Sequence, residues 1–199
     1  IIYTRFTRII TVGGDKRMSL KNTIMNAWRI SLLDTSTTES VAKDPKAFGQ
    51  GVLFVVLTGI IMGLGSLLFS ALAGAGAIGL IQLVMTPLLL LLVFFIWGLI
   101  VHVVAKILKG KGSLKRFYGG YGHTMLFYWI AIIPFIGQIL MSLAGLWNIV
   151  LQVNMIRKVY GFSTGKAVVT FVIPFLIIMI IVLALGVAFF AMVFSGMGT

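Results

Sequence analysis

Charged side chains are missing from three long stretches of the sequence. No Asp, Glu, Lys or Arg occurs at residues 47–105, 117–156 or 167–199. A helix needs about 20 mainly apolar residues to cross the roughly 30 Å hydrocarbon core of a bilayer, because each residue rises about 1.5 Å. The hydrophobic share is 60% and the charged share 10%, whereas soluble domains are nearer about 45–50% and 25%. The sequence therefore predicts an all-α membrane protein.

The three uncharged stretches divide into a bundle of five predicted transmembrane helices. A Gly/Ala run at 74–79 splits the first stretch, because glycine backbone is too permissive to favour continuous helix. The turn 134–138 splits the second stretch, and the third is too short for a hairpin. The predicted helices cover residues 51–72, 80–105, 119–134, 138–156 and 169–194, within a membrane domain at 45–199.

An amphipathic helix is expected at 19–34, ahead of the membrane domain. Leu20, Ile24, Trp28 and Leu32 recur at helical spacing, and the polar residues fall elsewhere on the wheel. Such a helix can lie in the membrane interface, or it can pack under the helix bundle, and both remain open. Residues 18–44 are thus assigned to a cytoplasmic amphipathic helix and linker.

The segment 1–17 is expected to be translated upstream sequence or a disordered extension. Gly13-Gly14-Asp15 precedes Met18, and purine-rich codons for these residues would form a ribosome-binding element ahead of a start at Met18. The segment is therefore left out of the fold prediction.

Basic residues gather in the loops that five helices would place on one side of the membrane. Lys109, Lys111, Lys115 and Arg116 follow the second predicted helix, while the turns 73–79 and 134–138 carry no charge. By the positive-inside rule the N-terminus is cytoplasmic and the C-terminus lies outside. The four residues are candidate contacts for anionic lipid headgroups; the alternative is that they only set the topology.

The remaining composition argues against enzyme, metal and nucleic-acid functions. There is no cysteine, and no carboxylate follows Asp44, so neither an intramembrane proton carrier nor a set of metal ligands is available. His102 and His123 are expected to make interhelical hydrogen bonds. The net charge of +12 indicates cationic loops facing an anionic leaflet. No catalytic residue, metal or cofactor is predicted.

Small and amide side chains mark candidate contacts between helices or with a partner. Gly59 and Gly63 form a Gly-x-x-x-Gly pair, and Asn148 and Gln152 lie one turn apart. Small residues let helices approach closely, and amides in lipid face the protein interior. These residues are expected to join helices; the alternative is a path for a small solute or a docking site.

The order of motifs along residues 45–175 resembles the Yip1 domain family. The positions that carry the resemblance are Pro45, Gly112, Tyr121, Gly122, Pro134, Trp147, Gly161, Lys166 and Pro174. The resemblance implies five membrane helices with a cytoplasmic N-terminus. Eukaryotic relatives act in vesicle traffic and contact Rab-type GTPases, but the short N-terminal extension is similar to that of bacterial and archaeal members. A Rab-type partner is therefore not expected. The expected location is the plasma membrane of a prokaryote.

These features together predict a non-enzymatic, multi-pass membrane scaffold. Its expected partners are the bilayer with anionic headgroups and other membrane proteins, or a second copy of the chain. One alternative is a permease or channel subunit for a small neutral or anionic solute, with a path past Asn148 and Gln152. A second alternative is an auxiliary subunit of a larger membrane complex.

Overall fold

The computed structural model describes residues 20–196, and every regular element among them is a helix. Two short helices come first, α2 (Leu20–Ser31) and α3 (Thr35–Lys43). The later elements are α4 (Ala47–Leu72), α5 (Gly76–Ile107), α6 (Leu114–His123), the 3₁₀ helix η1 (Thr124–Ile132), α7 (Ile136–Tyr160) and α8 (Thr164–Gly196). The segment 1–17 lies outside the described residues.

Four of the helices in residues 20–196 are long and apolar enough to cross a membrane: α4, α5, α7 and α8. The 26 residues of α4 and the 32 of α5 correspond to about 39 and 48 Å at 1.5 Å per residue. Both lengths exceed the roughly 30 Å of a hydrocarbon core. Four of the five predicted spans are therefore present as long α-helices.

The predicted helix at 119–134 is not one continuous α-helix, because the α-helix α6 stops at His123 and the chain continues as η1. Side chains form hydrogen bonds with backbone carbonyl groups at this point. The Thr124 hydroxyl donates to the Tyr121 carbonyl at 2.8 Å, and the Asn148 amide donates to the Thr124 carbonyl at 2.7 Å. Such bonds compete with the α-helical ladder. A 3₁₀ helix rises about 2.0 Å per residue, so nine residues still cover about 18 Å.

The other predicted boundaries are short by two to five residues at several ends. The turn after α4 is confined to residues 73–75, and α5 begins inside the Gly/Ala run at Gly76. α8 begins at Thr164 rather than 169 and continues through Pro174 without ending. Membrane helices tolerate both glycine and proline, since neighbouring groups form hydrogen bonds with the freed backbone groups.

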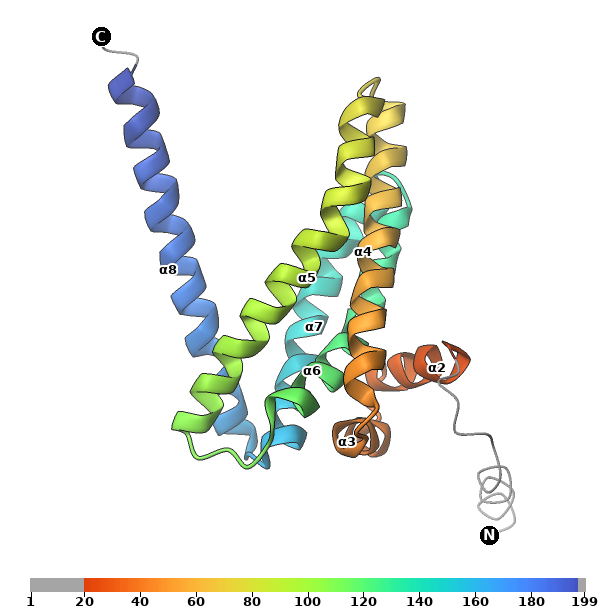
Figure 1. The fold of residues 1–199 in the computed structure, drawn as a ribbon, viewed down its shortest axis with the longest axis vertical. Helices are drawn as coiled ribbons and strands as arrows, with labels where there is room; N and C mark the ends of the chain where they lie inside the picture. Colours follow the sequence, from red (N-terminus) through yellow and green to blue (C-terminus); the bar gives the residue numbers. More distant parts are fainter. Residues whose placement is uncertain (1–19, 197–199) are drawn as a thin grey trace.

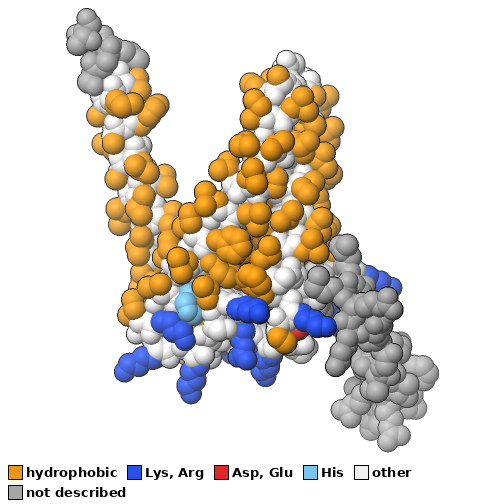
Figure 2. Space-filling model, in the orientation of Figure 1, with side chains coloured by type: hydrophobic (Ala, Val, Ile, Leu, Met, Phe, Trp, Pro, Cys, Tyr) orange, Lys and Arg blue, Asp and Glu red, His pale blue; other side chains and the backbone are white. Residues whose placement is uncertain are grey.

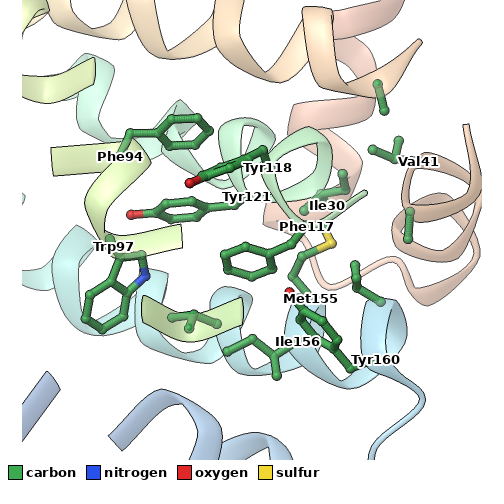
Figure 3. Close-up of a cluster of buried hydrophobic side chains, with 14 of the residues drawn as sticks. Ile30, Val41, Phe94, Trp97, Phe117, Tyr118, Tyr121, Met155, Ile156 and Tyr160 are labelled. Atoms are coloured by element: carbon green, nitrogen blue, oxygen red, sulfur yellow. The ribbon is translucent and has the colours of Figure 1, made fainter. Parts of the chain in front are cut away.

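The core of the molecule lies where α4, α5, α6 and α7 meet near the end that carries α2 and α3 (Figures 1 and 3). Tyr121 of α6 stacks on Phe94 of α5 and on Phe117, with ring centroids 5.0 and 5.5 Å apart. Met155 and Tyr160 of α7 complete the cluster and are buried. Aromatic packing thus joins α5, α6 and α7 at one level.

Glycines bring α4 and α6 into direct backbone contact. A Cβ at Gly51 would lie 2.6 Å from the Tyr118 carbonyl oxygen, and a Cβ at Gly122 would overlap the Gly51 carbonyl. No larger residue fits either position without moving a helix. The absence of a side chain at these two glycines therefore permits the crossing that sets the position of α6.

α8 is arranged differently from the other long helices. It contacts α5 and α7, but Figure 1 shows its far half leaning away from the bundle and ending opposite α2 and α3. Its apolar window is 17% buried, against 33% for each of the other three spans. α8 is therefore attached to the bundle at one end.

Candidate functional site

The basic residues lie together at one end of the molecule. On the face shown in Figure 2, the Lys and Arg side chains lie at the end that carries the α5–α6 and α7–α8 loops. Hydrophobic side chains dominate the rest of that face. Lys109, Lys111, Lys115 and Arg116 are all exposed, and none of them forms an ion pair among the described residues. This end therefore presents unneutralised positive charge.

The loop between α5 and α6 has a defined conformation. Lys109 has a φ of 65°, and the Gly110 amide donates to the Ala105 carbonyl at 2.8 Å. The Lys111 amide donates to the Tyr160 carbonyl at 3.1 Å, while a Cβ at Gly112 would overlap the Val159 carbonyl. The loop thus lies against the end of α7, which holds the lysine side chains outward.

The described acidic residues lie on and beside α3. The Glu39 carboxylate is 2.6 Å from Lys43 and 3.6 Å from Lys158 of α7, which lower the pKa of Glu39. Asp34 caps α3, accepting from Ser36 and Thr37 backbone amides at 2.9 and 3.1 Å. Hydrogen bonds, the Ser36 hydroxyl first among them, lower the pKa of Asp34 to about 2.

Asn148 and Gln152 belong to a chain of hydrogen bonds that runs from α5 to η1. The Trp97 indole donates to the Gln152 carbonyl oxygen at 2.7 Å, the Gln152 amide donates to Asn148, and Asn148 donates to the Thr124 carbonyl. Asn148 is 1% exposed and Gln152 8%. The two amides join three elements. Sequence reasoning missed Trp97 and Thr124 because they lie 55 residues from Gln152 and 24 residues from Asn148.

A cavity of about 510 Å³ lies beside this chain, between α5, α7 and α8. Its wall on α8 is wholly apolar, whereas the opposite wall includes Asn148, Gln152 and two tyrosines. The residues that line it are Val93, Trp97, Tyr121, Tyr128, Gly145, Asn148, Ile149, Gln152, Phe171, Phe175, Ile178, Met179 and Val182. No described residue that lines it is charged.

Gly59 and Gly63 lie where α4 crosses α5. A Cβ at Gly59 would be 2.5 Å from Pro87 Cα, and a Cβ at Gly63 would be 3.0 Å from Leu83 Cα. The pair therefore brings two helices of one chain together. Because α5 occupies that face of α4, these glycines do not offer a surface to a partner.

The family-motif positions serve turns and contacts between helices. Pro45 lies in the turn before α4, and Pro134 lies in the turn before α7, where its carbonyl accepts from the Ile136 amide at 2.7 Å. Gly161 has a φ of 70° and ends α7, while the Trp147 indole donates to the Ser31 carbonyl at 2.9 Å. Lys166 is exposed at the start of α8.

The two histidines bond to protein groups, each through Nδ1. His102 pairs with the Tyr160 hydroxyl at 2.8 Å, and His123 with the Gly119 carbonyl at 2.7 Å. Within residues 20–196 no group of three or more His, Cys, Asp and Glu residues could hold a metal ion.

α2 buries one face and exposes the other. Ala27, Ile30 and Ser31 are buried, whereas Ile24 and Trp28, and Leu32 just beyond the helix, are exposed. In Figure 1 the helix lies across the direction of α4, near the basic end. The exposed face of α2 therefore presents large apolar side chains at the level where the basic end begins.

The comparison with known families matches residues 32–186 to the Yip1 domain. The match covers α3 to α7 completely and α8 as far as residue 186. No curated protein and no solved structure matches the chain.

Proposed function

The chain belongs to the Yip1 domain family, and from that premise we propose that it is a non-enzymatic membrane scaffold that holds a partner membrane protein against its last helix. Its apolar helices make it an integral membrane protein. The observation that carries the proposal is the outer half of α8 (residues 180–196), where most of the large apolar side chains from Ile180 to Phe194 are exposed. A subunit of a larger membrane complex would use the same surface.

The exposed surface of α8 is apolar and also contains a groove. Leu183 is 68% exposed and Phe190 63%, and a groove of about 610 Å³ runs beside Gly186. Nothing lies within 4 Å of a Cβ built at Gly186. A small residue between large ones permits a second helix to approach closely, which is how membrane helices associate when lipid supplies no hydrophobic drive.

The proposal includes five membrane crossings, of which α6 and η1 together make the third along the chain. An odd number of crossings after α3 is supported by the position of α8, which ends at the opposite end of the molecule from α2 (Figure 1). The basic end would face the cytoplasm of a prokaryotic cell. Lys109, Lys111, Lys115 and Arg116 would then meet anionic headgroups, each worth about 1 kcal/mol near the surface.

α2 would lie in the interface at the same side of the membrane. Ile24, Trp28 and Leu32 occupy one face and are 36%, 51% and 62% exposed. A helix with such side chains buries them at the boundary of headgroups and acyl chains. Its other face packs on the protein, so both of the arrangements expected from the sequence are compatible in one helix.

A permease is less well supported than a scaffold. The amides that a solute would need are bonded to one another, to Trp97 and to Thr124. Opening a path between α5 and α7 would break this chain, and an unmade buried hydrogen bond costs about 1–3 kcal/mol. We expect proteoliposomes that contain the protein to show no flux of small neutral solutes above protein-free controls.

Two α8 variants that each place a leucine on the helix test the scaffold. Gly186→Leu fills the groove, whereas Ala184→Leu adds similar bulk two residues away, on the opposite side of the helix; Ala184 is exposed and does not line the groove. Each variant and the unaltered chain carry a photo-crosslinker at position 190, and cross-linking is performed in native membranes before mass spectrometry. The reference carries the crosslinker at Leu88, which is 55% exposed on α5.

The expected result is one recurrent membrane-protein adduct from position 190, absent from position 88. The adduct should fall about tenfold or more in Gly186→Leu and persist in Ala184→Leu, because lost close contact removes about 1.4 kcal/mol or more of helix association. Adducts with lipid alone at both positions, or equal loss in both variants, would reject the scaffold role for α8.

A further inference from the structure

The cavity between α5, α7 and α8 has a polar end that the scaffold role does not use. We propose that it binds one acyl chain of a phospholipid from the leaflet at the basic end, with the Tyr121 hydroxyl donating a hydrogen bond to the ester carbonyl. The lipid would then be a bound component of the protein, distinct from the surrounding bilayer.

The polar end has hydroxyl groups without partners. Tyr121 is 5% exposed and Tyr128 half-buried, and both line the cavity. Neither hydroxyl bonds to another group in residues 20–196, whereas the hydroxyls of Tyr118 and Tyr160 bond to Phe95 and His102. Neither hydroxyl oxygen is fully enclosed by protein, because the buried side-chain atoms without a partner among the described residues are Ser31 Oγ and His123 Nε2. Both tyrosines line the cavity, so a bound molecule there can offer either hydroxyl an acceptor.

The acceptor must be uncharged and must lie close to the headgroup layer. No charged side chain lines the cavity, so an ionised group would have no counter-charge there. Gln152 precedes Arg157 by five residues, which is about 7.5 Å of helix. The headgroup layer is about 5–7 Å thick on each side. The polar end therefore lies near the depth of phospholipid ester carbonyls.

The polar wall of the cavity favours a lipid over a protein helix. A partner helix would leave the Tyr121 hydroxyl beside apolar side chains, whereas a lipid supplies both an acyl chain for the apolar wall and a carbonyl for the hydroxyl.

The apolar wall and the rim suit the rest of the lipid. Phe171, Phe175 and Met179 line the cavity from α8, and the space beyond them opens where α8 leans away from the α4–α5 hairpin (Figure 2). Lys166 is exposed five residues before Phe171. An acyl chain could lie along α8 while the phosphate meets Lys166 at the basic end.

Native mass spectrometry of the full chain measures the bound lipid. The protein is reconstituted in nanodiscs of phosphatidylglycerol, extracted into mild detergent and delipidated, and the fraction that retains one phospholipid is counted. Gly145→Phe fills the cavity from α7, where a Cβ meets only the Tyr128 hydroxyl at 3.9 Å. Tyr121→Phe removes the proposed donor, and Tyr118→Phe is its control because Tyr118 does not line the cavity.

The unaltered chain should retain one phospholipid, and Gly145→Phe should lose it. Tyr121→Phe should weaken retention about fivefold, the effect of one hydrogen bond of about 1 kcal/mol, without lowering the unfolding temperature. Tyr118→Phe should retain the lipid. No retained lipid, equal retention in Gly145→Phe, or retention of detergent alone would overturn the proposal. The α8 cross-linking result is independent, since Gly186 lies outside this cavity.

Discussion

The inner bundle and the outer half of α8 are made from similarly apolar sequence but are packed in opposite ways. In the bundle, glycines such as Gly51 and Gly122 bring backbones together, and a buried hydrogen-bond chain passes through Asn148. On α8, Leu183 and Phe190 remain more than three-fifths exposed. The contrast shows that hydropathy alone does not determine which helices form the core.

The difference has a physical origin in the solvent. Lipid tails are as apolar as leucine, so an apolar helix face in a membrane need not be covered by protein. Close backbone approach and buried polar bonds are therefore what hold the bundle together. α8 lacks both in its outer half, which leaves that half available to a partner.

The largest expected effect is at the crossing of α4 and α6. Gly122→Ala places a Cβ onto the Gly51 carbonyl and should cost about 3 kcal/mol or more of unfolding free energy, since two helices must separate. The matched change Gly186→Ala on α8, with nothing within 4 Å, should stay within about 0.5 kcal/mol. Unfolding in detergent mixtures measures both. Equal stability of the two variants would remove the contrast between the regions.

The next effect is at the polar chain of the bundle. Asn148→Leu leaves the Gln152 amide and the Thr124 carbonyl without their partner, which should cost about 2 kcal/mol. Asn154→Leu is the control, because Asn154 is half-buried on the same helix outside this chain. The same unfolding assay should find a clearly smaller loss for Asn154→Leu. Similar losses in both would mean that the chain does not stabilise the bundle.

The cap of α3 gives a smaller effect with a defined pH dependence. Asp34→Ala should cost about 1 kcal/mol, because it removes the acceptor of two backbone amides. The folded-state pKa of Asp34 is about 2, against an ordinary value of 3.8. Its contribution is therefore complete above pH 3.8 and is lost as the pH falls towards 2.

Asp34→Asn separates the cap from its charge. An asparagine keeps a capping oxygen but does not titrate. Its unfolding free energy should match the unaltered chain within about 0.5 kcal/mol near neutral pH and lack the acid-dependent part contributed by Asp34. An unchanged acid dependence in Asp34→Asn would contradict the assignment.

The smallest expected effect on stability is on the outer half of α8. Leu183→Ala should change the unfolding free energy by less than about 0.5 kcal/mol, since Leu183 is 68% exposed. Leu151→Ala on α7 removes a side chain that is 1% exposed and should cost about 2–5 kcal/mol. A large loss for Leu183→Ala in the isolated protein would show that α8 packs more tightly than described.

Much of the fold follows from where charge is absent. The uncharged stretches predicted α4, α5, α7 and α8, because length and hydropathy are enough to identify a spanning helix. The same properties could not separate an α-helix from η1. That switch depends on Asn148, which reaches the Thr124 carbonyl from a helix 24 residues later in the chain.

The candidate sites were predictable to different degrees. The exposed lysines at the basic end were identified, because charge segregates visibly along the chain. Asn148 and Gln152 were identified without their partner Trp97, which lies 55 residues from Gln152. Tyr121 was identified only as a family-motif position. Its place in the cavity wall depends on the angle between α8 and the bundle, and no local sequence pattern specifies that angle.

The proposed topology has an odd number of membrane crossings and places the basic end in the cytoplasm. The sequence contains no cysteine, so single cysteines can be placed at Lys111, Ala77 and Phe194 and labelled with a membrane-impermeant maleimide in intact cells. This topology predicts labelling at positions 77 and 194 and none at position 111 until the cells are opened. Labelling of position 111 from outside, or protection of position 194 together with position 111, would contradict it.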